Sequence, residues 1–281
     1  MKLRPPTGRR IANLVVSLWA GASALIGIVI LFWIIFVVIS RGLGALNLDF
    51  FTHLPTPPGM SGGGLANAIV GTLVLTGAAT LLAVPIGLMA GIYLAEFSDD
   101  SKAGDYSRFS ANVLMGMPSI IVGVFAYTLV VVPLGNFSGY AGALALAILM
   151  LPVITRTTED MLRLVPNTLL ESALALGAPR WKVTLVIVFR AAKGGLITGI
   201  LLAVARVSGE TAPLLFTALN SPYWFHSLGE PTPNLTVTIF NYAMSPYPDW
   251  QQKAWGASLL ITFGVLIITI LARFFLREKK V

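Results

Sequence analysis

The chain has 281 residues, of which 56% are hydrophobic and only 11% are charged. Soluble domains usually carry about 25% charged residues, so this composition excludes a water-soluble fold and predicts an integral membrane protein. The formal net charge of +7 does not indicate a nucleic-acid partner, because the basic residues cluster in short connecting segments, where they set orientation in a membrane. The chain has no cysteine, which excludes disulfides and thiolate metal sites.

Uncharged stretches long enough to cross a bilayer recur along the chain, since a spanning helix needs about 20 apolar residues. We therefore expect an all-α protein with six transmembrane helices, at 15–39, 65–95, 109–132, 141–155, 196–219 and 254–272. The third and fourth are separated at "PLGNFSGYAG" (Pro133–Gly142), which has the residues of a turn. Pro85 predicts a kink in the second helix.

The remaining segments complete the expected organisation. Tails at 1–14 and 276–281 flank the chain, and a Pro/Gly-rich loop at 40–66 separates the first helix from a helical core at 67–275. Two long segments, 156–195 and 220–252, interrupt that core. If both termini are cytoplasmic, all of the 19 Lys and Arg except Arg41, Arg206 and Lys253 lie on the inner side. The positive-inside rule therefore predicts cytoplasmic termini and a cytoplasmic 156–195 segment.

The cytoplasmic segment "RLVPNTLLESALALGAPRWKVTLVIVFRAAKGG" (Arg163–Gly195) predicts a short amphipathic helix, a break and a second helix leading into the fifth span. Asn167 is a good N-cap, and Glu171 sits early in the helix, where its charge suits the dipole. Gly177 ends this helix, and Pro179 starts the next. The short helix could lie on the membrane surface, pack against the bundle, or dock a cytoplasmic partner.

Part of this segment, "ESALALGAPRWKVTLVIVF", is similar to the EAA loop of ABC importer permeases. The motif positions are occupied by Glu171, Ser172, Ala173, Gly177 and Ile187. Ser172 replaces the middle Ala, and Phe189-Arg190 stands where Leu-Pro is usual. The resemblance implies a type I ABC importer permease fold with a coupling helix that docks in a groove of an ATPase subunit.

The chain has no G-x-x-x-x-G-K-[ST] sequence to hold the phosphates of ATP. We therefore expect no enzymatic activity, cofactor or metal in this chain, and expect ATP and Mg²⁺ to be bound by a separate ATPase subunit. The alternative is a channel or secondary transporter that uses no ATP. Secondary transporters often show two repeated halves, and no such repeat is visible.

Arg206 and Glu210 stand within the predicted fifth span, where a charge costs about 2.5–3.5 kcal/mol. Arg206 is expected about 15 Å deep, near the midplane. Glu210 is four residues after Arg206, so both are expected to point to one face and can pair, and one alternative is an ion pair that only fixes packing. We favour a substrate pathway, because Arg suits bidentate contact with a tetrahedral oxyanion. Glu210 could accept a phosphate proton, and Ser208 and Thr211 could add hydroxyl donors.

A second resemblance narrows the substrate. "AVARVSGETAPLLFTA" (Ala203–Ala218) resembles the fifth-span segment of phosphate ABC importer permeases of the PstA type, and "MGMPSIIVGVFAY" (Met115–Tyr127) is similar to their third-span segment. PstC-type sister permeases carry a similar GETA segment, so the choice of PstA rests on the N-terminal third. The resemblance implies a multi-pass permease of the bacterial inner membrane that moves inorganic phosphate by alternating access.

The same resemblance implies the partners. These are a PstC-type second permease, two PstB-type ATPases, and a periplasmic phosphate-binding protein received by the outer loops, especially 220–252. Three alternatives stay open. They are an ABC importer of another oxyanion, sulfate or molybdate, a non-ABC channel, and a structural or signalling membrane subunit.

Overall fold

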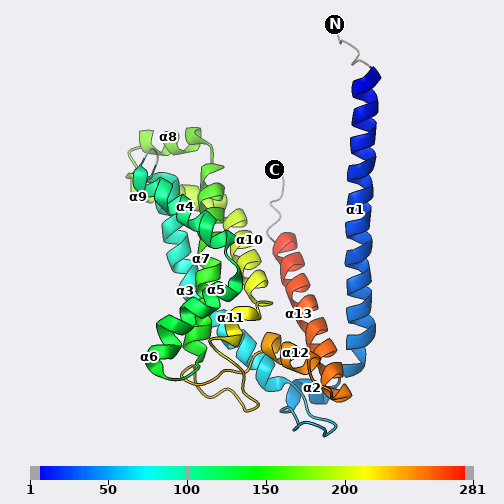
Figure 1. Ribbon diagram of the computed structural model, residues 1–281. Helices are drawn as coiled ribbons and strands as arrows, with labels where there is room; N and C mark the ends of the chain where they lie inside the picture. The colour runs from blue at the N-terminus through cyan, green and yellow to red at the C-terminus, as the bar shows by residue number, and fades with distance from the viewer. Residues whose placement is uncertain (1–6, 99–100, 276–281) are drawn as a thin grey trace.

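The computed structural model describes residues 7–98 and 101–275, with side chains for residues 8–98 and 101–270, and the described chain is helical with no named strand (Figure 1). Five helical runs are long and apolar enough to cross a membrane. They are α1 (Thr7–Gly42), α3 (Ala66–Glu96), α7 (Gly139–Arg163), the continuous run α9–η3–α10 (Arg180–Val207) and α13 (Pro248–Phe275). The prediction of an all-α membrane protein is confirmed.

Shorter elements connect these helices. They are η1 (Leu43–Ala45), α2 (Leu48–Thr52), α4 (Lys102–Gly116), α5 (Ser119–Ala126), η2 (Tyr127–Val131), α6 (Val132–Leu134), α8 (Asn167–Ala175), α11 (Ala212–Leu215) and α12 (Leu235–Ala243), whereas the spanning run Arg180–Val207 itself consists of α9 (Arg180–Lys182), η3 (Val183–Val188) and α10 (Phe189–Val207). Among them, α4 and the run α5–η2–α6 are together long and apolar enough to form one span, which is bent by 104° between them. If this bent pair is counted as one span, the described chain has the six spans that were predicted.

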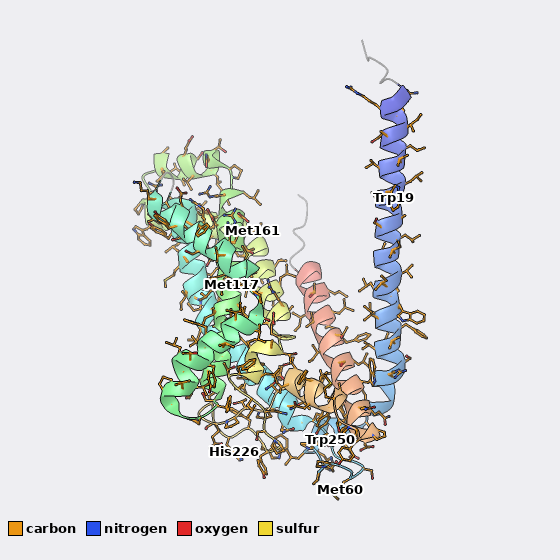
Figure 2. The ribbon with its side chains drawn as sticks, viewed as in Figure 1. Trp19, Met60, Met117, Met161, His226 and Trp250 are labelled. Atoms are coloured by element: carbon orange, nitrogen blue, oxygen red, sulfur yellow. The ribbon has the colours of Figure 1, made fainter. Side chains whose placement is uncertain are left out.

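The third span predicted at 109–132 is therefore not one continuous helix. Ser101 caps α4, because its Oγ accepts a hydrogen bond from the Gly104 amide at 3.0 Å. Met117, at the bend between α4 and α5 (Figure 2), has extended backbone angles. A residue that precedes proline is disfavoured in the helical region, so Pro118 explains why α4 stops and α5 begins in a new direction.

The fourth and fifth helices also differ from the prediction. α7 does not stop near residue 155 but continues to Arg163, because its charged residues pair with one another at helical spacings. The fifth helix, predicted at 196–219, ends at Val207 instead. Gly209 is a poor helix former, and Pro213 lacks the amide that a continuing helix requires.

Tight packing between α3 and α7 forms the centre of the bundle. Small residues allow this approach: a Cβ on Gly87 would lie 2.8 Å from the Ile154 side chain, and one on Gly91 would lie 2.7 Å from the Thr155 carbonyl oxygen. Small residues are the usual means by which membrane helices pack closely. α3 continues past Pro85 as one helix.

α1 stands apart from the bundle over most of its length. It contacts α13 near the C-terminal end of α1 (Figure 1). There Gly42 packs against Leu259 and the Trp255 carbonyl oxygen, and the Arg41 guanidinium lies 5.4 Å from the Trp255 ring centroid. Trp19, farther up α1, projects from the helix with no other element beside it (Figure 2). The exposed apolar surface of α1 suits lipid or another membrane subunit.

The two ends of the bundle carry different elements. α8, the start of α1 and the end of α13 lie toward one end, which we name the α8 end (Figure 1). α2, α12 and the 220–234 loop lie toward the other, which we name the α12 end. This arrangement puts the predicted coupling segment and the predicted outer loops at opposite ends of the bundle.

Candidate functional site

The short helix predicted in the coupling segment is present as α8. Asn167, which was expected to be the N-cap, is instead the first residue of the helix. Pro166 is the N-cap, because it has extended backbone angles and its carbonyl oxygen accepts a hydrogen bond from the Leu169 amide at 3.0 Å. The helix stops before Gly177, whose φ of +82° lies in the left-handed region that glycine tolerates. The predicted end of the helix is confirmed.

The four predicted coupling residues divide between two sides of α8. Ala173 is buried beneath the helix in a cluster with Leu162, Val183, Val188, Ala192 and Leu196. Glu171, Ser172 and Gly177 are exposed, and the Ser172 hydroxyl donates to the Thr168 carbonyl oxygen. α8 therefore rests on the bundle through Ala173 and leaves its other face open.

Several apolar side chains in and beside α8 are nevertheless exposed. Leu176 is 89% exposed, and Leu169, Leu174 and the neighbouring Trp181 are also exposed. Exposed apolar side chains gathered at the end of a membrane bundle are typical of a docking surface for another protein.

The segment that contains Arg206 and Glu210 is a break between helices, not one continuous span. α10 ends at Val207, residues 208–211 are outside any helix, and α11 follows. The Glu210 carbonyl oxygen accepts a hydrogen bond from Thr236 Oγ1 on α12 at 3.0 Å. The break is therefore held in place by α12.

The alternative of an ion pair between Arg206 and Glu210 is not met in this structure. Arg206 lies in the last turn of α10 and is exposed, whereas Glu210 is half-buried three residues beyond the helix end. Within the described residues neither side chain has a recorded partner. The prediction that both share one helix face is wrong, because the helix that would align them at i and i+4 stops between them.

The depth of Arg206 remains that of an intramembrane residue. The preceding charge on α10 is Lys193, and a rise of about 1.5 Å per residue puts Arg206 about 20 Å farther along the helix, inside a hydrocarbon core of about 30 Å. An arginine at this depth normally faces a bundle interior or a water-filled cavity rather than lipid. Its exposure on this chain therefore indicates a surface that another subunit or the transport pathway covers.

Ser208 and Thr211 do not converge on one cavity with Arg206. Ser208 lines a mainly apolar crevice of ≈ 630 Å³ between α3, α10 and α13, together with Thr72, Thr76 and Thr80, and Arg206 is not among its lining residues. Thr211 is half-buried at the break. The four predicted pathway residues thus lie in and around the break between α10 and α11, and Ser208 alone among them lines this crevice.

The two sequence segments that suggested a phosphate permease lie against each other. Gly123 of α5 packs on Pro213 of α11, and a Cβ on Gly123 would lie 2.6 Å from the Pro213 Cα. The α5 helix and the broken fifth span therefore form one unit beside Arg206 and Glu210. The sequence did not predict this contact, because the two residues are far apart along the chain.

A buried ion cluster at the α8 end was not predicted. Glu159 of α7 is 1% exposed, and it accepts from Arg108 Nε at 2.7 Å and from Arg156 at 3.0 Å, with Arg163 at 3.2 Å. Arg108 also donates to the Leu94 carbonyl oxygen and to Ser98 Oγ. The cluster ties α4 and the end of α3 to α7, next to α8. The i, i+3 and i+4 spacing of its α7 members was the available sequence signal.

Comparison with known proteins shows the family to which the chain belongs. Residues 83–278 match the family described as "Binding-protein-dependent transport system inner membrane component". The chain is 47% identical over 272 residues to the phosphate transport system permease protein PstA of Yersinia pestis, covering 97% of this chain and 92% of that protein. It is 49% identical over 258 residues to PstA of Haemophilus influenzae, covering 92% and 91%.

The chain belongs to the PstA-type branch of this permease family. It is thus a multi-pass component of the inner membrane and a part of a transport system. Solved structures agree on the fold. A chain of the MetNI methionine ABC transporter matches with a TM-score of 0.61 at 19% identity, covering 76% of this chain and 94% of its own. A chain of a bacterial alginate ABC importer matches with a TM-score of 0.66 at 14% identity, covering 97% and 100%.

Proposed function

We propose that this chain is one of two membrane subunits of an ATP-driven importer that moves inorganic phosphate across the inner membrane by alternating access. The observation that carries the proposal is near-50% identity, along almost the whole chain, to proteins named as phosphate transport permeases. Sulfate or molybdate importers, an ATP-independent channel and a structural subunit are the alternatives that the experiment below separates.

Arg206 supports phosphate as the cargo. A guanidinium presents five N–H donors that suit a tetrahedral oxyanion. The C-terminal end of α10 carries partial negative charge, so an anion near this end needs a fixed cation, and Arg206 lies in that last turn. Glu210 follows at the break, where a carboxylate can accept a hydrogen bond from the P–OH group of HPO₄²⁻ or H₂PO₄⁻, a donor that sulfate lacks. Ser208 and Thr211 add hydroxyl groups along the same segment.

The partners follow from the two ends of the bundle. A PstC-type second permease would cover the surface that exposes Arg206. Two PstB-type ATPases would bind ATP and Mg²⁺, and one of them would dock on α8 through Glu171, Ser172 and Gly177, with Ala173 anchoring the helix from beneath. The α8 end and both termini would then be cytoplasmic, and the α12 end would meet a periplasmic phosphate-binding protein.

The test is ATP-dependent uptake of radiolabelled phosphate into vesicles that hold the complete complex. We expect Arg206→Gln to abolish uptake and Arg206→Lys to retain part of it. Arg190→Gln is the matched control, since Arg190 is an exposed arginine on the same helix before the apolar stretch. Excess sulfate should not compete.

The outcomes separate the alternatives. Competition by sulfate or molybdate indicates another oxyanion importer, and uptake without ATP indicates a channel. Normal uptake by an assembled Arg206→Gln complex removes Arg206 from the pathway. Co-purification of all subunits with each variant excludes loss of assembly as the cause.

A further inference from the structure

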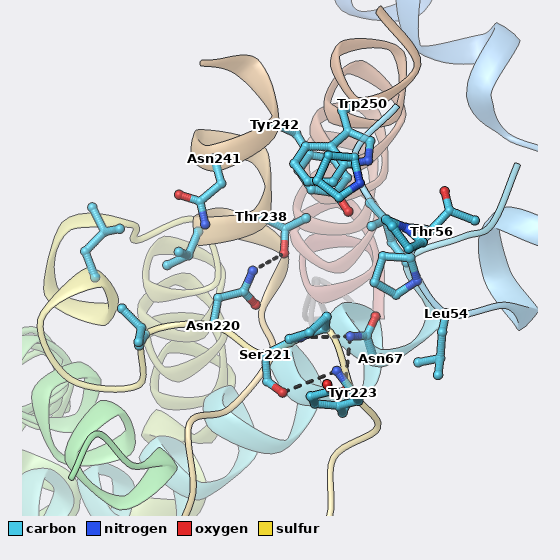
Figure 3. Close-up of a pocket in the computed structure, with 18 residues that line it drawn as sticks. Leu54, Thr56, Asn67, Asn220, Ser221, Tyr223, Thr238, Asn241, Tyr242 and Trp250 are labelled. Atoms are coloured by element: carbon cyan, nitrogen blue, oxygen red, sulfur yellow. Dashed lines mark hydrogen bonds between the residues drawn. The ribbon is translucent and has the colours of Figure 1, made fainter. Parts of the chain in front are cut away.

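A cavity of ≈ 660 Å³ opens at the α12 end, away from Arg206 (Figure 3). Its walls come from the loop after α2 (Leu54 and Thr56), the start of α3 (Asn67), the loop after α11, and α12 with Trp250 of α13. The volume lies within the range of about 300–1,000 Å³ typical of ligand sites.

Two buried polar atoms in the cavity wall lack a hydrogen-bond partner within the described residues. Asn67 is 1% exposed, and its Nδ2 donates to the carbonyl oxygens of Ser221 at 3.0 Å and Tyr223 at 3.2 Å, but its Oδ1 has no partner. Trp250 Nε1 is likewise buried without an acceptor. A buried polar group without a hydrogen-bond partner destabilises a protein by about 1–3 kcal/mol. A ligand that donates to Asn67 Oδ1 and accepts from Trp250 Nε1 would remove this cost.

The cavity offers no charge to an ionic ligand. No Asp, Glu, Lys, Arg or His is among its described lining residues. Burial raises the pKa of Tyr242 to about 12, which keeps this lining hydroxyl neutral at physiological pH. Tyr242 stacks on Trp250 with ring centroids 4.3 Å apart, and Pro55, Pro57, Pro58 and Pro222 complete an apolar wall. Phosphate would find no countercharge here, so the cavity is not a second anion site.

Amide groups match the two unmet atoms. An amide N–H can donate to Asn67 Oδ1, and an amide carbonyl oxygen can accept from Trp250 Nε1. Peptide loops supply such groups together with apolar side chains that suit aromatic and proline walls. A bound water satisfies single polar atoms, but it leaves most of a cavity of this volume unfilled.

We propose that this cavity receives an uncharged, amide-bearing loop of the periplasmic binding protein. The inference rests on the proposed function, because that function places the α12 end in the periplasm and supplies the partner. It adds the point of contact and the chemistry of the contacting segment, which differs from the anion chemistry of Arg206.

The first test measures how tightly the phosphate-loaded binding protein binds the complete complex in lipid nanodiscs. Trp250→Phe keeps an aromatic ring for the Tyr242 stack and removes the donor. We expect the dissociation constant to rise two- to tenfold, the usual effect of losing one hydrogen bond. If the indole N–H has no partner in the complex, affinity stays unchanged and thermal stability rises, which overturns the proposal.

The second test blocks the cavity. Asn241 lines it from α12, is exposed, and has no recorded side-chain hydrogen bond within the described chain. Asn241→Trp should weaken binding at least tenfold. Ala243→Trp is the matched control, because Ala243 is exposed on the same helix but does not line the cavity, and it should leave binding within twofold of wild type.

The third test identifies the occupant. The chain has no native cysteine, so Asn241→Cys accepts a single photoreactive benzophenone label, with Ala243→Cys as control. Cross-linking of residue 241 to the binding protein supports the proposal, whereas cross-linking to lipid or to the second permease overturns it. Wild-type phosphate uptake is measured in parallel. If uptake fails, the proposed function is wrong; if uptake is normal and the three tests are negative, only the docking inference is wrong.

Discussion

Replacing Glu159 with glutamine should strongly destabilise the protein. The Glu159 carboxylate is 1% exposed and is the shared partner of Arg108, Arg156 and Arg163 at 2.7, 3.0 and 3.2 Å. Glu159→Gln has nearly the same shape but no negative charge. It leaves three guanidinium groups facing one another around a neutral amide.

The structure sets the magnitude of this effect. Removing one partner of a buried ion pair costs about 3–5 kcal/mol, since the remaining charge stays buried. Arg108 is 20% exposed, whereas Arg156 and Arg163 are 40% and 45% exposed and can turn toward water. We therefore expect the lower end of that range, about 3 kcal/mol.

The neighbouring acid provides the matched control. Asp160 is 49% exposed, and its recorded ion pair is to Arg156 Nε at 3.5 Å. Exposed pairs contribute about 0–1 kcal/mol, so Asp160→Asn should have little effect. The two variants change adjacent residues of one helix by the same chemistry and differ chiefly in burial.

The assay is denaturant-induced unfolding of the purified complex in mild detergent, followed by tryptophan fluorescence. The expected result is a free energy of unfolding lowered by about 3 kcal/mol for Glu159→Gln and by under 1 kcal/mol for Asp160→Asn. Equal unfolding curves for the two variants would refute the reasoning, because burial would then have no bearing on the cluster's contribution.

Two further predictions concern packing and pH. Gly91→Ala should destabilise the protein by about 1–3 kcal/mol, because the new Cβ would lie 2.7 Å from the Thr155 carbonyl oxygen; Gly77→Ala on the same helix, with no atom within 4 Å, should not, and equal unfolding midpoints would contradict this. Folding raises the pKa of Tyr242 from 10.0 to about 12. The contribution of the neutral Tyr242 to the free energy of unfolding is therefore complete below pH 10 and is lost between pH 10 and 12. Tyr242→Phe should lose less stability than wild type across that interval, and parallel pH profiles would contradict this.

Local sequence signals predicted those parts of the site whose structure depends only on neighbouring residues in the chain. Proline before and glycine after α8 predicted a short helix, and the helix is there. The end of the fifth helix has an equally local cause in Gly209 and Pro213, but the prediction of 196–219 followed the apolar run and did not use these two residues as an end signal. The bend at Pro118 was missed for the same reason, since hydropathy reports burial in lipid and not backbone direction.

Composition by itself determined that the chain is a membrane protein, because an 11% charged chain cannot cover a water-facing surface. The length of the uncharged stretches predicted that it is all-α. The place of Arg206 within one of those stretches marked it as a functional candidate, because an intramembrane charge is costly wherever it lies. Only the tertiary structure decided which residues meet. Arg108 reaches Glu159 across 51 positions, and Asn67 reaches Ser221 across 154. Such contacts depend on how helices cross, which helical periodicity within each segment does not specify.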